Sequence, residues 1–258
     1  MNRRSTVDVY LAASDAGDSV NSGFGFLVAV VPTLMFGAVV ALVVFLIIRG
    51  QRIAARQRAR AIALAAHYGF LIDASTKGPP PQRFDAFGTG HSRKVTNQLW
   101  RPGSTDSVFD YTYTTGSGKN QTTHRRTCAL VALPFDAPYT KIATENFFST
   151  LGQRLGIRDI ETESVRFNDV YRITSDDERF AITLLDSSAI DWLLEHIPNG
   201  PGSVTFELWG PWLLCISKRM AIDAQFGFLD WARSVPDQFP DVLTSLHPIT
   251  EQSPPWPT

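Results

Sequence analysis

The chain has 258 residues, 44% of them hydrophobic and 19% charged, which fits one globular domain of ordinary size plus an additional element. Its 24 Lys and Arg nearly balance its 25 Asp and Glu, and five arginines lie within residues 49–60, so the rest of the chain has 19 basic against 25 acidic side chains. Proteins that bind nucleic acid need clustered basic surface, so this balance predicts no nucleic-acid partner.

The first predicted element is a transmembrane helix over residues 24–48, preceded by an extracytoplasmic tail over residues 1–23. Residues 24–48 contain no charged side chain. A helix of that length spans about 37 Å, which exceeds the roughly 30 Å of a hydrocarbon core. A cleavable signal peptide is the alternative, but its apolar part is shorter and follows basic residues, whereas acidic and small residues precede this one. An uncleaved anchor is therefore the favoured interpretation.

A pair of small residues lies inside this predicted span. Gly37 and Ala41 have the small-x-x-x-small spacing that lets two helices approach closely, which would give a homodimer through the transmembrane helix. Such pairs are frequent by chance in Ala-rich spans. Lipid-facing packing is therefore the favoured interpretation.

Residues 49–68 are predicted to form a basic juxtamembrane helix. Arg49, Arg52, Arg56 and Arg60 fall within one stripe about 80° wide at 100° per residue, where they would contact anionic lipid headgroups. The favoured alternative is that these charges only stop transfer and set orientation. Either way they predict a single-pass plasma-membrane protein with its N-terminus outside and its C-terminal domain in the cytoplasm.

A Pro-rich linker is predicted over residues 69–82, a globular domain over 83–250 and a Pro-rich tail over 251–258. Within the domain, "SVFDYTYTT" alternates, which places Phe109, Tyr111 and Tyr113 on one face of a strand. A second β-rich run covers residues 123–133. Strands that precede grouped helices indicate an α+β fold: a mainly antiparallel sheet with flanking helices after the transmembrane helix.

The later elements are shorter and mixed. Ser175 is predicted to cap a helix by accepting from the backbone of Glu178. The other expected elements are helices over residues 145–155, 175–185, 187–197 and 221–235, and strands over 158–164, 168–174, 203–208 and 212–218, with Trp209-Gly210-Pro211 as a turn between the last two.

The segment "TTGSGKNQT", residues 114–122, resembles a phosphate-binding loop at first sight. That motif needs G-x-x-x-x-G-K-[S/T], and here Tyr113 replaces the first Gly and Asn120 the hydroxyl residue. A strand follows where a helix is required. Gly and Asn between two alternating runs are typical of a hairpin tip instead.

Other catalytic and metal motifs fail as well. The five histidines are dispersed and the two cysteines, Cys128 and Cys215, lack a C-x-x-C partner, so neither a metal nor a cofactor is expected. His91 and His124 lie among polar residues and are the weak catalytic candidates, although ordinary surface histidines are the favoured interpretation. The cysteines suit a reducing compartment, whereas a disulfide between them would indicate an extracytoplasmic domain.

Several blocks together resemble a known family. "GHSRKVTNQL", "FDYTYTTGSGKNQTTH", "CALVALP" and "FNDVYRITSDDERFAITLLDSSAIDWLL" are similar, in this order, to uncharacterised actinobacterial single-span membrane proteins. The last block also resembles the C-terminal part of a broader bacterial domain of unknown function. The resemblance implies a membrane-anchored cytoplasmic or envelope domain, and it implies no catalytic residue.

Two functions therefore remain open. The first is a non-catalytic interaction or scaffold module at the membrane, whose domain binds membrane lipid or a protein partner. The alternative is a membrane-associated enzyme that acts on a lipid or envelope precursor. A deep polar pocket that collects His91 or His124 with carboxylates would favour the enzyme, and a closed core with an exposed apolar patch would favour the module.

Overall fold

The computed structural model describes residues 39–53, 55–56, 59–79, 84–144 and 159–249 of the chain. These residues belong to two compact units, Met1–Arg58 and Ala59–Thr258. The predicted helix over residues 145–155 and the tail over 251–258 lie outside the described residues. The boundaries proposed between linker and domain stay predictions.

The described residues of the first unit, 39–53 and 55–56, are helical. Arg49 and Arg52 lie in this described part of the helix. Within the described part of the chain, no helix combines the length and apolar character needed to cross a membrane. The predicted transmembrane helix over residues 24–48 is thus wrong as a feature of the fold, although 24–38 lie outside the described residues. The predicted orientation, which depended on that span, loses its support.

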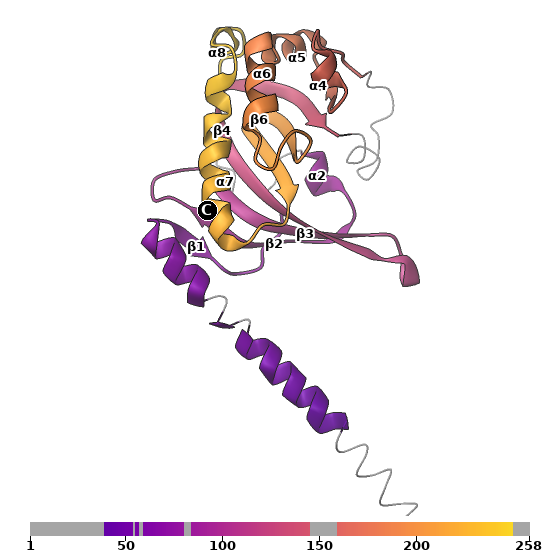
Figure 1. Cartoon of the computed structure of the whole chain (residues 1–258), viewed down its shortest axis with the longest axis vertical. Coiled ribbons are helices and arrows are strands. Elements are labelled where there is room, and N and C mark those ends of the chain that lie inside the picture. Colours follow the sequence, from indigo (N-terminus) through magenta and orange to yellow (C-terminus); the bar gives the residue numbers. More distant parts are fainter. Residues whose placement is uncertain (1–38, 54, 57–58, 80–83, 145–158, 250–258) are drawn as a thin grey trace, which may run out of the picture. The chain divides into compact units, whose positions relative to one another are not determined.

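The second unit is built on a six-stranded antiparallel sheet (Figure 1). The strand order is β1-β2-β3-β4-β5, and β6 pairs with β4. This confirms the antiparallel sheet with flanking helices that the sequence predicted. The strands are β1 (Leu71–Asp73), β2 (His91–Trp100), β3 (Ser107–Thr115), β4 (Thr122–Ala143), β5 (Arg172–Ser175) and β6 (Val204–Lys218).

The hairpin between β3 and β4 forms where the alternating runs predicted it. Thr115 pairs with Thr122, and the tip holds a single 3-10 turn, Gly118–Asn120. Gly116 has φ +80°, and a Cβ there would lie 2.2 Å from the carbonyl oxygen of Asn120, so no other residue fits without a shift of the backbone. The segment is a hairpin tip, as predicted.

The longest strands, β4 and β6, correct two predictions. β4 continues ten residues beyond Leu133, through Pro134 and Pro138, to Ala143. The predicted turn at residues 209–211 does not exist, because β6 passes through it as one strand. The pairing slips between Ala132 and Thr140, opposite Gly210, whose φ is +56°. These bulges absorb the prolines and the glycine, so the strands bend without breaking.

Helices cover the sheet unevenly. α7 (Ile222–Ser234), which confirms the predicted amphipathic helix, packs on β3 and β4. Figure 1 shows the short α-helices that follow β4 in the chain gathered at one end of the domain and the β3–β4 hairpin extended at the other. The remaining helices are α2 (Asp85–Gly88), α4 (Val165–Asn168), α5 (Glu178–Leu184), α6 (Ser187–His196), α8 (Val242–Leu246) and a 3-10 turn, Pro236–Gln238.

Two local predictions before α5 are wrong. Residues 159–164, the described part of the strand predicted at 158–164, form no strand beyond a single bridge between Ile160 and Ile173. The cap of α5 is Asp177, whose carboxylate accepts from the backbone N–H of Phe180 at 3.1 Å, because Ser175 still belongs to β5. Asp is as good a cap as Ser, so the helix begins two residues later than expected.

Each face of the sheet has its own apolar core. The larger core lies under α5, α6 and α7, and the smaller one under the α2 segment, where Phe87 packs on Phe84, Phe109 and Tyr111. Cys128 belongs to the smaller core and Cys215 to the larger, and both are free thiols. The disulfide that would have indicated an extracytoplasmic domain is absent.

Candidate functional site

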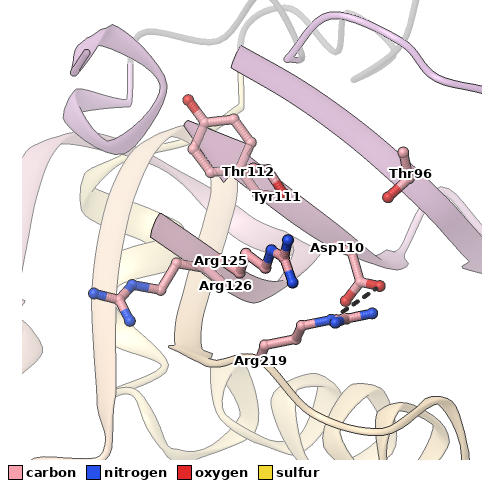
Figure 2. Close-up of a pocket in the computed structure, with 7 residues that line it drawn as sticks. All are labelled: Thr96, Asp110, Tyr111, Thr112, Arg125, Arg126 and Arg219. Carbon is pink, nitrogen blue, oxygen red and sulfur yellow. Dashed lines mark ion pairs between the residues drawn. The ribbon is translucent and has the colours of Figure 1, made fainter. Parts of the chain in front are cut away.

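A polar pocket of about 260 Å³ opens on the sheet beside the β3–β4 hairpin (Figure 2). We call it the arginine pocket. Its lining combines three arginines with one carboxylate, two hydroxyls and a tyrosine: Thr96, Asp110, Tyr111, Thr112, Arg125, Arg126 and Arg219.

Strand register explains why Asp110, Thr96, Thr112 and Arg125 lie together, whereas Tyr111 and Arg126 alternate to the other face of the sheet. Asp110 of β3 lies opposite Thr96 of β2, and Thr112 lies opposite Arg125 of β4. Residues directly opposite in an antiparallel pair, and residues two apart on one strand, share a face of the sheet. Asp110, Thr112 and Arg125 therefore lie on the same face. Arg219 follows the end of β6, and in Figure 2 its guanidinium faces Asp110.

Asp110 is held by donors from three different elements. Asn97 has φ +53° at an irregularity of β2, and its Nδ2 donates to Asp110 Oδ2 at 2.9 Å. Thr127 Oγ1 and Gln225 Nε2 donate to Oδ1 at 3.4 and 3.0 Å. A bulge of this kind re-aims the side chain it carries, here onto the carboxylate.

The charge of Asp110 is partly compensated. Burial raises the pKa of its carboxyl above the ordinary value, and the hydrogen bond from Asn97 and the charge of Arg219 oppose this rise. Arg219 Nε lies 4.0 Å from Asp110 Oδ2, and 54% of the Arg219 side chain is exposed. The pair is therefore loose, and the guanidinium can turn to another anion.

The exposed guanidiniums decide what the pocket can bind. Arg125 and Arg219 are both exposed, and each offers several N–H donors in a planar fork that suits phosphate or carboxylate oxygens. The negative charge of Asp110 disfavours a second anion directly beside it, but its hydrogen bonds to Asn97, Thr127 and Gln225 hold this part of the pocket in place. The arrangement is suited to binding an anionic group.

A second polar cluster lies under α2, on the opposite face of the sheet. Glu207 of β6 is fully buried and pairs in register with Lys141 of β4, with Oε1 3.7 Å from Nζ. Asp85 lies 4.0 Å from the same Nζ, and the backbone N–H of Ala86 donates to Glu207 Oε2 at 3.2 Å. Burial raises the pKa of Glu207 to about 7, against the lowering effect of Lys141. This cluster attaches α2 to the sheet.

The predicted catalytic candidates lie elsewhere, near the hairpin tip. The ring nitrogens of His91 lie 3.2 Å from Ser92 Oγ and from the carbonyl oxygen of Gly116. His124 is 2.8 Å from Thr115 Oγ1 and stacks on Tyr113, and its pKa is lowered by partial burial and by a nearby arginine. Neither histidine lines the arginine pocket.

The predicted headgroup contacts are all exposed. Arg49, Arg52 and Arg56 belong to the first unit and Arg60 to the second, so the single stripe predicted for them stays a prediction. Within the described residues, no three His, Cys, Asp or Glu side chains are placed to hold a metal ion.

The arginine pocket was not predicted from the sequence. Two basic doublets, Arg125-Arg126 and Lys218-Arg219, were visible in the sequence. The doublets are about 90 residues apart in the sequence, and they are brought together only by the pairing of β4 with β6.

Comparisons with known proteins add one structural neighbour. No protein-family model matches the chain, and no curated protein matches it. A solved structure, the mycobacterial trehalose monomycolate transport factor A, TtfA, matches with 11% identity over 76% of this chain and 98% of that chain, at a TM-score of 0.47. These values are too low to assign the neighbour's transport role to this chain.

Proposed function

We propose that the chain is a non-catalytic binding module that works at a membrane and holds an anionic group of its ligand in the arginine pocket. The observation that carries the proposal is the pocket itself, in which Arg125 and Arg219 offer exposed guanidiniums beside a fixed carboxylate. The donors that surround Asp110 are an amide of β2, a hydroxyl of β4 and an amide of α7, and they give the site a rigid frame.

The pocket favours binding over the rival hypothesis of an enzyme. That hypothesis needs a histidine beside a carboxylate in the pocket, and both candidate histidines bond to atoms at the hairpin end. The carboxylate of Asp110 accepts hydrogen bonds from Asn97, Thr127 and Gln225 and does not contact either candidate histidine. The site thus has recognition groups in place, while the proposed acid–base pair has no counterpart in its lining.

Association with a membrane is supported by the helix of the first unit. Its residues 39–48 expose a continuous series of large apolar side chains: Val39, Val40, Leu42, Val43, Val44, Phe45, Leu46, Ile47 and Ile48. Exposed apolar surface of this extent marks contact with lipid or with a partner. Arg49 follows directly, as expected for a segment at a lipid headgroup. We also propose kinship with the actinobacterial family that the sequence blocks resemble, which brings no activity with it.

Titration with inorganic phosphate tests the pocket. The full chain, purified in uncharged detergent, is titrated by calorimetry, with a dissociation constant of about 1 mM expected for so open a site. Arg219→Gln and Arg125→Gln should each weaken binding about tenfold, since a charge-assisted hydrogen bond contributes about 1.5–3 kcal/mol. Arg166→Gln, an exposed arginine on α4, is the matched control. Absence of saturable binding, or equal loss in the control, would refute the proposal.

A further inference from the structure

The arginine pocket is part of a larger basic surface at the hairpin end of the domain, which we call the basic end. All of its members are exposed except the half-buried Arg126. Along the strand segments that supply them, residues 91–96, 107–127 and 216–220, Asp110 is the one acidic residue. The members are Arg93, Lys94, Lys119, Arg125, Arg126, Lys218 and Arg219.

Strand register places like charges next to one another on both faces of the sheet at the basic end. Arg126 of β4 lies directly opposite Lys218 of β6 on one face, and Lys94 and Arg125 lie on either side of Thr112 on the other. Like charges directly opposite on neighbouring strands destabilise a sheet. Their concentration here, in a chain of net charge −1, indicates a surface shaped for an anionic partner.

We propose that the basic end binds the surface of a bilayer that contains anionic lipid, with the arginine pocket taking one headgroup phosphate. This inference rests on the proposed function and names its partner. A lipid surface is favoured over other polyanions because the same chain carries the exposed apolar helix over residues 39–48. Basic residues at a membrane surface are attracted to the negative potential of anionic lipids.

The hairpin tip defines the kind of contact. Residues 114–123 contain hydroxyl and amide side chains, glycines and Lys119, with no large apolar residue. The basic end therefore lies against headgroups without inserting into the acyl region. Its contribution is electrostatic, so it weakens as salt shortens the Debye length from about 10 Å at 0.1 M to about 3 Å at 1 M.

A fluorophore at the tip separates this contact from binding by the apolar helix. Ser117→Cys, in the exposed tip, is labelled with an environment-sensitive dye, while Cys128 and Cys215 are fully buried and protected from labelling. The full chain is mixed with phosphatidylcholine vesicles, with or without about 30% phosphatidylglycerol. We expect a blue shift only with the anionic vesicles, reversed by about 1 M salt. A dye on Ser188→Cys, on α6, should not respond.

The decisive comparison uses two double variants. Lys94→Gln/Lys119→Gln removes two charges of the basic end outside the pocket, and Arg166→Gln/Arg179→Gln removes two exposed charges from α4 and α5 at the other end (Figure 1). Lys94→Gln/Lys119→Gln should weaken the affinity for anionic vesicles, read from the dye response, about tenfold. Arg166→Gln/Arg179→Gln should leave this affinity unchanged.

The outcomes separate this inference from the proposed function. An equal effect of both double variants, or a response to neutral vesicles, overturns the lipid contact while phosphate binding in the pocket stands. A larger response to duplex DNA than to anionic vesicles of equal charge also overturns it. If the full chain does not bind phosphate but the dye still responds to anionic vesicles, the proposed anion binding in the arginine pocket is refuted. The proposed lipid contact of the basic end then stands.

Discussion

Asp110 and Glu207 are two carboxylates on opposite faces of one sheet, and they are held in different ways. Burial raises the pKa of both. Asp110 has amide and hydroxyl donors and a loose arginine at the rim of an open pocket. Glu207 is completely buried, with Lys141 as its ionic partner and Ala86 as a backbone donor.

The comparison shows how one sheet separates a recognition site from a structural one. Neutral donors fix the position of Asp110 without neutralising the exposed arginines around it, so charge stays accessible to a ligand. The ion pair under α2 is enclosed, so its charges act on stability alone. Substitutions under α2 should therefore change folding, and substitutions in the pocket should change binding.

The largest expected effect comes from Lys141→Met. This change leaves Glu207 buried without its nearest cation, and breaking a buried pair in this way costs about 3–5 kcal/mol. The full decrease in the free energy of unfolding is expected at pH 8. A smaller decrease is expected at pH 5, where Glu207 is protonated. Urea unfolding at the two pH values measures the difference.

A double variant controls this prediction. Lys141→Met/Glu207→Gln removes both charges of the pair and should recover most of the stability at pH 8. If the double variant is as unstable as the single one, lost packing around Lys141 explains the effect and the ion pair does not.

The next effect is a pH dependence carried by Glu207. Its pKa rises from the ordinary 4.5 to about 7 on folding, so between these values the folded protein binds the proton more tightly than the unfolded chain. Stability from this group is present below about pH 4.5 and is lost as the pH rises to about 7, by up to about 3 kcal/mol. Glu207→Gln should remove this component. If the free energy of unfolding of the unchanged protein and that of Glu207→Gln vary in parallel between pH 4.5 and 7, this prediction is wrong.

Much of the sheet was predictable because its signals are local. Strand β3 matches the alternating run at residues 107–115, and α7 covers all but the first and last residues of the predicted helix at 221–235. The errors lie where long-range pairing overrides local signals. Pro134, Pro138 and Gly210 argue against strands, yet the bulged pairing of β4 with β6 accommodates all three.

The candidate site was less predictable because its partners are remote in sequence. Gln225 donates to Asp110 across 115 residues, and no periodicity reports such a contact. His91 and His124 were chosen for their polar neighbours along the chain, which says nothing of what lies across the sheet. The apolar stretch at residues 39–48 was recognised from the sequence, and its large side chains are exposed.

A smaller stability effect is expected for Asp110→Asn, with a gain in binding. Asparagine keeps one acceptor oxygen but turns an NH₂ group toward the donors of Asn97 or Gln225, which should cost about 1 kcal/mol. Removing the negative charge should tighten binding of inorganic sulfate several-fold at pH 8. Calorimetric titration with sulfate measures this change in Asp110→Asn. Glu207→Gln is the control, and it should bind sulfate as the unchanged protein does.

The smallest effect on folding is expected for Arg219→Gln. More than half of the Arg219 side chain is exposed and its ion pair with Asp110 is 4.0 Å long, so the free energy of unfolding should change by less than about 0.5 kcal/mol. Phosphate binding should nevertheless fall about tenfold, because the guanidinium is one of the exposed forks of the pocket. Arg219→Lys should restore the charge but only part of the affinity, since an ammonium cannot present two parallel donors to one phosphate. Full rescue by lysine would mean that the pocket senses charge alone and that the planar geometry of Arg219 contributes nothing to recognition.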